Sequence, residues 1–466
     1  MSNSVSGSGP AVSPEAQAPP ASEPEPTALG YLGLDVGQCA VTACLLLADG
    51  REAVRRWSVP NTRPGAEALV GRVVELADQH GLGRLRIGLE ATGLYWWPLA
   101  CLLNDTPLLQ GLQPEVYALN PNLVHGLKKV YADTGKTDPR DAFLIAERLR
   151  IGRLPAPFQL DMVYAPLQRL TRYRTHLSQT LAREKGYFLN FLFVQFSGFS
   201  QEKPFSDTFG PTSQALLEQF STEEIAQASL EDLAAFIQEH GRGGFTDPEV
   251  VAANLRRAAR ESYQLNSALQ PPLGLVLGMT RATIRILQAQ LVTVDQTIAR
   301  ELRALPAHAR TIDSVPGLGP VWTAGLVAEI GNIQRFTDDA AVAKYAGLVW
   351  PPHESGDFQA QDSRLSKAGN SYLRYYLVEA ANSVRQHCPE YRHYYLTKFA
   401  QTPKHSHQRA LVLTARKLVR LVDALLRTGS VYRSPTCDQN QEEVRTTPHA
   451  ARPRPQRRAR LVTSAS

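Results

Sequence analysis

The first third of the chain alternates short apolar runs with longer amphipathic stretches. Apolar runs bounded by Gly, Pro or Asp are typical of strands, and apolar residues three and four apart are typical of helices. The pattern predicts strands at 31–36, 41–47, 54–59, 85–90 and 115–118, and helices at 64–80, 95–104 and 139–150. Hairpin strands followed by strands that alternate with helices predict a mixed α/β sheet.

The middle third is predicted to be helical. From Ile284 to Ile298 the apolar positions alternate strictly by three and four residues, and 167–191 carries a weaker version of this pattern. Two such stretches favour a coiled-coil pair, folded back within one chain or shared between subunits. The alternative is two amphipathic helices on a common core. Between them, 195–280 contains short helical patterns to which the sequence assigns no role.

The last third begins near Ile312 and is predicted to be mainly helical as far as Tyr432. Both chain ends are poor in large apolar residues and are expected to be disordered, and the C-terminal end is rich in arginine. The predicted organisation is a disordered tail at 1–29, an α/β domain at 30–153, a helical linker with an insertion at 154–305, a mainly α domain at 306–432 and a basic tail at 433–466.

Composition narrows the class of protein only slightly. The 466 residues carry a net charge of +6, which is a mild bias over this length, and the hydrophobic share of 43% is typical of globular proteins. The five scattered cysteines indicate reduced thiols and no zinc site. No apolar run reaches the ~18 residues of a membrane span, and the N-terminus lacks a secretory signal. We expect a cytoplasmic protein without a membrane partner.

Four carboxylates stand at the ends of the predicted elements. Asp35 and Glu90 each close an apolar strand, whereas Asp138 and Asp141 open a helix. Hard oxygen ligands on rigid elements, open to a phosphate, are what a Mg²⁺ site for phosphoryl transfer requires. Pro139 makes helix capping the alternative for the last pair, and capping is compatible with ligation. We predict a nucleic-acid enzyme that uses Mg²⁺.

These residues carry a resemblance to a known family. The stretch 31–150 resembles the RuvC-like, ribonuclease-H-type domain with a D-E-D-D acidic set that begins one family of insertion-sequence transposases. The matching phrases are Gly33-Leu-Asp35, Leu89-Glu-Ala-Thr-Gly93, Asn120-Pro121 and Lys136-Thr-Asp138-x-x-Asp-Ala142. Members have a second, serine-bearing domain and are described as bridge-RNA-guided recombinases. The resemblance implies that Asp35, Glu90, Asp138 and Asp141 hold magnesium beside the reacting phosphate.

The C-terminal half extends this resemblance. The segment 345–356 is similar to the one in which the family places its nucleophilic serine, and that residue is Ser355 here. A serine hydroxyl needs a base or a stabilised phosphate charge before it attacks. Basic groups that could supply this stabilisation follow at Arg364, Lys367 and Arg374, and His353 is a candidate base.

A helix-hairpin-helix-like start precedes the serine segment. In 314–325 a Gly-x-Gly turn, Gly317 and Gly319, could direct backbone N–H groups at a phosphate. The same Pro-Gly-x-Gly pattern also occurs as a plain turn between helices. We list both glycines with the three basic residues as candidate nucleic-acid contacts.

The resemblance implies a DNA transposase that cleaves and rejoins element ends and target DNA through a phosphoserine intermediate. It also implies guidance by a structured non-coding RNA and a composite site in a homodimer or homotetramer, with the protein at the nucleoid when active. Two alternatives stay open. One is a hydrolytic two-metal DNA nuclease or junction resolvase, and the other is a transposase relic that binds nucleic acid without catalysis.

Overall fold

The computed structural model describes residues 28–130, 138–159, 161–351, 354–355, 358–359 and 364–434. The chain divides into two compact units, Met1–Leu160 and Asp161–Ser466. Each unit has its own hydrophobic core, and each is described separately below.

The first unit is built around a five-stranded mixed sheet in the order β3-β2-β1-β4-β5. Its strands are β1 (Ala28–Val36), β2 (Ala40–Leu46), β3 (Trp57–Pro60), β4 (Leu82–Glu90) and β5 (Glu115–Leu119). The hairpin strands β1, β2 and β3 pair antiparallel, whereas β4 runs parallel to β1 and to β5. The predicted mixed α/β sheet is confirmed.

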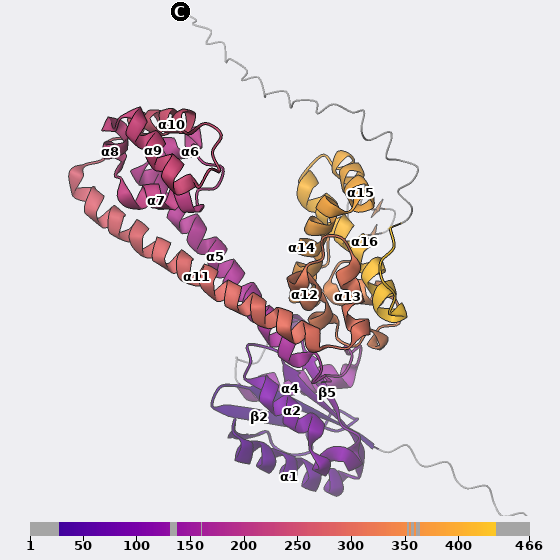
Figure 1. The fold of residues 1–466 in the computed structure, drawn as a ribbon. Coiled ribbons are helices and arrows are strands. Elements are labelled where there is room, and N and C mark those ends of the chain that lie inside the picture. Colours follow the sequence, from indigo (N-terminus) through magenta and orange to yellow (C-terminus); the bar gives the residue numbers. More distant parts are fainter. Residues whose placement is uncertain are drawn as a thin grey trace, which may run out of the picture. The chain divides into compact units, whose positions relative to one another are not determined.

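Helices cover both faces of this sheet (Figure 1). Leu32 and Leu34 of β1 pack into the core beneath α1 (Arg63–His80) and α2 (Trp96–Asp105). Tyr31, one position earlier, packs into the core under α3 (Pro121–Val130) and α4 (Asp138–Ile151). Side chains alternate between faces along a strand, so the odd-numbered positions of β1 face α4.

Every predicted strand and helix between residues 31 and 150 is present, with ends that differ by at most three residues. Two elements were not predicted, the helix α3 and a 3₁₀ helix at Pro107–Leu112. Helix α3 has Leu123, Val124 and Leu127 at helical spacing, and Asn120-Pro121 before them is a typical helix start, but the run is short. Its packing against α4 stabilises a helix of only ten residues.

Helix α4 meets the sheet at two glycines. Gly33 of β1 and Gly88 of β4 are paired in register. A Cβ on Gly33 would overlap the backbone of Ala142 and Ala146 in α4, and a Cβ on Gly88 would lie 2.9 Å from Ile145. The two glycines therefore let the helix backbone lie directly on the strands.

The second unit contains two long helices, α5 (Ala165–Gln195) and α11 (Gln270–Ala304), which run side by side (Figure 1). Ile284, Leu287 and Ile298 of the predicted heptad stretch are buried in α11. An ion pair joins Arg174 of α5 to Asp295 of α11, with 2.6 Å between Nε and Oδ1. The two heptad stretches thus pack against each other within one chain, so these residues are not available to bridge subunits.

Five shorter helices follow α5 at the end of the pair where α11 begins. They are α6 (Ser197–Glu202), α7 (Pro211–Gln219), α8 (Thr222–Gln227), α9 (Leu230–Gly241) and α10 (Pro248–Arg260). Their core is rich in phenylalanine and includes Phe188 and Leu192 of α5. This small core packs against the end of the helical pair that contains the C-terminus of α5 and the N-terminus of α11.

The C-terminal helices form the main core of the second unit. They are α12 (Pro320–Ile330), α13 (Asp339–Ala346), α14 (Ser371–His387), α15 (Pro389–Ala400) and α16 (Ser406–Thr428). Tyr376 of α14 is fully buried against α12, where Gly325 leaves room for its ring. Its hydroxyl donates a 2.7 Å hydrogen bond to the Thr171 carbonyl of α5. This contact ties the C-terminal helices to the long helical pair.

No helix in the described parts of the chain is long and apolar enough to cross a membrane. Among the described residues, Cys39, Cys44 and Cys388 form no disulfide. Cys44 is buried in β2, and this burial raises the pKa of its thiol to about 12, so the thiol is protonated at neutral pH and a poor nucleophile.

The close contact between α4 and Gly33 leads to a stability prediction. We expect Gly33→Ala to destabilise the first unit by about 1–3 kcal/mol, because the new methyl group must push α4 away from the sheet. The matched control is Gly71→Ala in the exposed part of α1, where a Cβ meets nothing within 4 Å. The control should be neutral or stabilising by up to ~1 kcal/mol.

Hydrogen exchange resolved by peptide measures this effect, because the two units need not unfold together. Faster exchange confined to β1, β4 and α4 is expected for Gly33→Ala. Unchanged protection of these elements would show that the close approach does not hold the helix in place.

Candidate functional site

Asp35 and Glu90 lie side by side at the same edge of the sheet. They are the residues two positions after Gly33 and Gly88, which are paired in register. Glu90 is the last residue of β4, and Asp35 is the last but one of β1. Side chains two positions apart share a face, so both carboxylates belong to the face covered by α4. Each is half-buried. The sheet thus brings together two acids that are 55 residues apart in the sequence.

A polar row continues from Asp35 across the hairpin strands. Thr42 of β2 is the register partner of Asp35, and Ser58 of β3 is the partner of Thr42. The Thr42 and Ser58 hydroxyl oxygens lie 3.0 Å apart in a hydrogen bond. Polar side chains of the hairpin strands therefore lie next to Asp35 on this part of the sheet.

The third predicted acid is positioned by α4. Asp141 immediately precedes Ala142, the residue whose backbone meets Gly33, so the first turn of α4 lies close to the strand ends that carry the other two acids. Asp141 is half-buried. Asp138 begins α4, and its side chain lies outside what the structure describes.

Among the described side chains, no group of three or more His, Cys, Asp or Glu residues is close enough to hold a metal ion together. The donor chemistry nevertheless fits magnesium, which prefers carboxylate oxygens and retains several waters of its own. Asp35, Glu90 and Asp141 supply such oxygens from two strand ends and one helix start. These residues are therefore of the right chemical type to hold magnesium.

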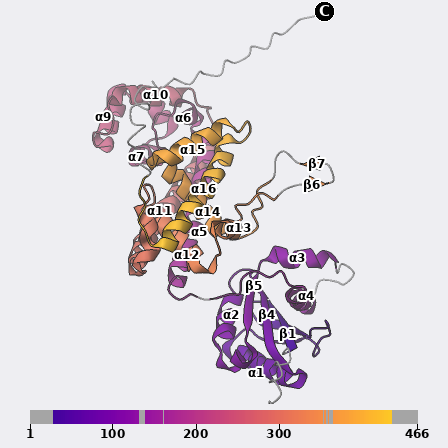
Figure 2. The same ribbon diagram turned by 90° about the vertical axis from the view of Figure 1, so that its right-hand side faces the viewer.

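The predicted serine lies in the second unit, in a short hairpin between α13 and α14. Ser355 ends β6 (Glu354–Ser355) and pairs with Phe358 of β7 (Phe358–Gln359). In Figure 2 this hairpin stands apart from the bundle of C-terminal helices. The side chain of Ser355 and the whole of His353 lie outside the described residues.

Main-chain hydrogen bonds join the two arms that lead to this hairpin. The Ser366 amide donates to the Val349 carbonyl at 2.9 Å, and the Asn370 amide donates to the Tyr345 carbonyl at 2.7 Å. Arg374 of α14 completes the junction, because its Nη1 donates to the carbonyls of Ala346 and Lys367 at 3.0 and 2.9 Å. The backbone segments that lead into and out of the hairpin are therefore held together by hydrogen bonds, and we call this junction the base of the hairpin.

The three basic residues predicted to contact nucleic acid differ in their surroundings. Arg364 and Lys367 are exposed, and Lys367 has a positive φ of 53°. Arg374 is half-buried and bonded to main-chain carbonyls, and this burial lowers the pKa of its guanidinium. Arg374 therefore has a structural role at the base of the hairpin, and a contact with nucleic acid stays a prediction for all three.

The two predicted turn glycines also differ. Gly317 has a φ of +94° and packs against the backbone of α14 at Ser383, whose hydroxyl donates a 2.7 Å bond to the Gly317 carbonyl. Gly319 caps the N-terminus of α12, and a Cβ there would meet nothing within 4 Å. Packing against α14 is sufficient to explain a glycine at position 317. At Gly319 no side chain covers the N-terminus of α12.

Sequence reasoning missed a buried charge behind the serine segment. Glu329 of α12 has a fully buried side chain and is held by Arg172 of α5, with 2.7 Å from Nε to Oε1 and 2.9 Å from Nη2 to Oε2. Burial alone would lower the pKa of Arg172, but its hydrogen bonds with Glu329 and the charge of Glu329 raise it. A lone acid in the apolar run of α12 was the available signal.

This ion pair reaches the serine segment through Asn370. The Asn370 amide group donates a 2.7 Å hydrogen bond to Glu329 Oε2. Its carbonyl oxygen accepts from the Tyr372 and Leu373 amides at 3.0 Å and so caps α14. The carboxylate of Glu329 thereby fixes where α14 starts and where the segment after the hairpin ends.

Comparison with known proteins places both units in one family. A model of DEDD transposases of IS110 elements, described as "Transposase", matches residues 32–196, which include all four predicted acids. A second model, described as "Transposase IS116/IS110/IS902 family", matches residues 309–396, which include Ser355. Together the two models match more than half of the chain.

Two curated relatives match over most of their length, and a third matches over less than half of its length. A 44.8 kDa protein of insertion element IS116 from Streptomyces clavuligerus is 28% identical over 86% of this chain and 96% of its own. A 42 kDa protein of IS900 from Mycobacterium paratuberculosis is 26% identical, and the match covers 87% of this chain and 98% of that protein. A probable family 20 transposase from Pseudomonas aeruginosa is 30% identical, and the match covers 32% of this chain and 46% of that protein.

Among solved structures, T. thermophilus RuvC in complex with a Holliday junction substrate matches 28% of this chain and 99% of its own length, at 15% identity and a TM-score of 0.22.

The two family models, and the relatives matched over most of their length, define the class: the protein is a transposase of insertion sequences. The chain belongs to the IS110/IS116/IS902 family, as the sequence motifs predicted.

The buried ion pair leads to a second stability prediction. We expect Glu329→Ala to destabilise the second unit by about 3 kcal/mol, the lower end of the effect for a buried pair, because it leaves the half-buried Arg172 without its counter-charge. The control is Glu301→Ala, which breaks a 3.5 Å pair with Arg300, whose side chain is 70% exposed. That loss should stay below ~1 kcal/mol.

Thermal unfolding of the two variants and of the unchanged protein gives the comparison. Similar small shifts for both variants would contradict a structural role for the buried pair.

Proposed function

We propose that this transposase cuts and rejoins DNA through a covalent link to Ser355, assisted by Mg²⁺ held at Asp35, Glu90, Asp138 and Asp141. The observation that carries the acidic half is the juxtaposition of Asp35 and Glu90 on the face where α4 begins. The serine half rests on the similarity of 345–356 to the family's serine segment. The fixed base of the β6–β7 hairpin supports it.

In the proposed step, the Ser355 hydroxyl oxygen attacks a DNA phosphorus atom and loses its proton. A new oxygen–phosphorus bond forms, and the bond from phosphorus to one sugar oxygen breaks. That sugar oxygen leaves as a hydroxyl group with a proton. Because one phosphate ester replaces another, the link conserves the bond energy, and a new strand can be joined by the reverse reaction without ATP.

Negative charge increases on the phosphate oxygens during this attack. Bound Mg²⁺ would supply Lewis-acid stabilisation of this charge. The carboxylates of Asp35, Glu90 and Asp141 are on rigid strand ends and a helix start, and such preorganised groups do not have to reorganise during the reaction. Exposed Arg364 and Lys367 are available to bind the phosphate backbone.

Two further parts of the proposal rest on the family resemblance alone. They are a structured RNA that pairs with element and target DNA, and a homodimer or homotetramer that combines the acidic unit of one subunit with the serine of another. The acidic residues and Ser355 lie in different units of the chain, which is compatible with such a composite site.

Loss of Ser355 is the direct test of the serine step. We expect the unchanged protein, incubated with Mg²⁺, co-expressed RNA and labelled element-end DNA, to give a protein–DNA adduct that survives denaturing electrophoresis. Ser355→Ala should lose this adduct completely, because no other atom replaces the nucleophile. The control Ser371→Ala changes an exposed serine at the start of α14 and should retain it. An adduct that persists in Ser355→Ala sinks the assignment.

Loss of the acids tests the metal site. We expect Asp35→Asn or Asp141→Asn to slow DNA cleavage by about 100-fold or more, the size of effect seen when one preorganised stabilising group is removed. Chelation of Mg²⁺ should have the same effect. Asp49→Asn is the matched control, since Asp49 is an exposed carboxylate of the same unit paired with Arg51. Equal activity of all three variants would remove the acids from the reaction.

The same experiments separate the two alternatives. A hydrolytic nuclease would give free cut ends without an adduct, and Ser355→Ala would still cut. A relic that only binds nucleic acid would show salt-sensitive binding and no cutting in any sample.

A further inference from the structure

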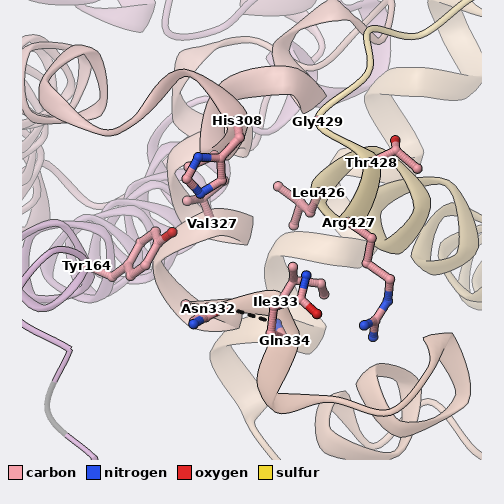
Figure 3. A pocket seen from close by; sticks show the side chains of 12 residues that line it. Tyr164, His308, Val327, Asn332, Ile333, Gln334, Leu426, Arg427, Thr428 and Gly429 are labelled. Carbon is pink, nitrogen blue, oxygen red and sulfur yellow. Dashed lines mark hydrogen bonds between the residues drawn. The ribbon is translucent and has the colours of Figure 1, made fainter.

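The second unit contains a cavity of about 220 Å³ that is separate from the serine segment. Its walls come from the residue before α5, the start of the 3₁₀ helix Ala307–Ser314, the C-terminal end of α12 with the turn after it, and the C-terminal end of α16. Figure 3 shows Tyr164 and His308 on one side of the cavity and Thr428 on the other. The described residues that line it include none of those proposed for catalysis.

The two rings differ in polarity and in exposure. Tyr164 is almost fully buried, and this burial, followed by the charge of Asp161, raises the pKa of its hydroxyl, which therefore remains a neutral donor. His308 is exposed at the rim. An aromatic ring at the wall and an imidazole at the rim provide surfaces on which a flat ligand can stack.

The other walls are rich in hydrogen-bond acceptors. Helices α12 and α16 both end at the cavity, with Gly331 and Gly429 as their C-caps. Carbonyl groups at a helix C-terminus carry partial negative charge and accept hydrogen bonds. The amide side chains of Asn332 and Gln334 lie between these ends, and Asn332 is fixed by a 2.9 Å bond from the Gln334 backbone amide. The cavity therefore favours a ligand that carries N–H donors for the helix ends and also acceptors for the Tyr164 hydroxyl and the Asn332 side-chain NH2 group.

The charge of the cavity argues against a phosphate. Its only arginine, Arg427, is paired with Asp423 at 3.0 Å and also donates a 2.7 Å bond to the Phe336 carbonyl. The helix C-termini add partial negative charge and would repel an anion. The fitting ligand is flat, uncharged, rich in N–H donors and smaller than the drug-sized ligands of typical ~300–1,000 Å³ pockets.

From these features we propose that the cavity holds an unpaired nucleobase of a single-stranded nucleic acid, with preference for bases that carry an amino group. The base would stack against Tyr164 and His308. Its amino and ring N–H groups would donate to the helix-end carbonyls and to the Gln334 side chain. The choice of a nucleic acid as ligand rests on the proposed function, but the site does not require the Ser355 step.

Binding of a short oligocytidine and of an abasic strand of equal length to the full-length protein tests this proposal. Fluorescence anisotropy at fixed salt compares the two, since the backbone contribution is common to both. We expect the oligocytidine to bind at least about five-fold more tightly, the lower limit for one stacked base. An oligouridine strand should bind between them.

Two variants locate the effect. His308→Ala and Gln334→Ala should each reduce the preference for oligocytidine over the abasic strand by about five-fold or more. His393→Ala is the matched control, because His393 is an exposed histidine of the same unit outside the cavity. Tyr164→Phe retains the ring and should lose less than His308→Ala. Unchanged thermal unfolding of each variant shows that the fold is intact.

Parallel RNA and DNA strands identify the source of the base. A preference lost in the variants for RNA alone assigns the cavity to an RNA, and one lost for DNA assigns it to a displaced DNA strand. Equal binding of oligocytidine and abasic strands by the unchanged protein, or an undiminished preference in both variants, overturns the proposal. These affinities do not depend on strand cleavage, so they stand or fall separately from the covalent adduct at Ser355.

Discussion

The close approach of α4 to β1 at Gly33 is the contact on which the candidate acidic site depends. Any side chain at this position would overlap the helix backbone, so only glycine lets the first turn of α4 reach the strand ends. Asp141 is carried on that turn, and Asp35 is two residues along the strand. The parallel pairing of β1 with β4 then adds Glu90 from the neighbouring strand. One steric constraint thereby positions carboxylates from three elements.

The serine half depends on a different interaction, the buried pair of Glu329 and Arg172. A charge in an apolar helix is costly unless it is paired and hydrogen-bonded, and Glu329 has three such bonds from Arg172 and Asn370. Through Asn370 the pair determines where α14 begins. The segment that leads out of the hairpin carrying Ser355 is thus attached to a fully buried carboxylate, although the hairpin stands apart from the helical bundle (Figure 2).

Much of the first unit could be predicted because its apolar pattern is regular. Runs such as 31–36 and 85–90 are strands in the structure, and the helix at 64–80 begins and ends within one residue of its prediction. Helix α3 was missed although Leu123, Val124 and Leu127 have helical spacing, because so short a run forms a stable helix only when it packs against α4. The heptad stretches indicated two partnered helices but left the partner open. The structure pairs α5 with α11 through buried residues such as Ile284 and Leu287.

The sequence by itself determined the family, the mixed sheet and the identity of the candidate acids and serine, because these follow from local patterns and short motifs. Only the tertiary structure decided which residues support them. Gly88 carries no signal in the sequence, Glu329 is only a lone acid in an apolar run, and Arg374 was predicted to contact nucleic acid. Their structural roles arise from contacts between residues far apart along the chain. The cavity beside Tyr164 and His308 is of the same kind, because its walls meet only when four separate segments pack together. Local patterns report local conformation, whereas burial and close approach depend on the whole fold.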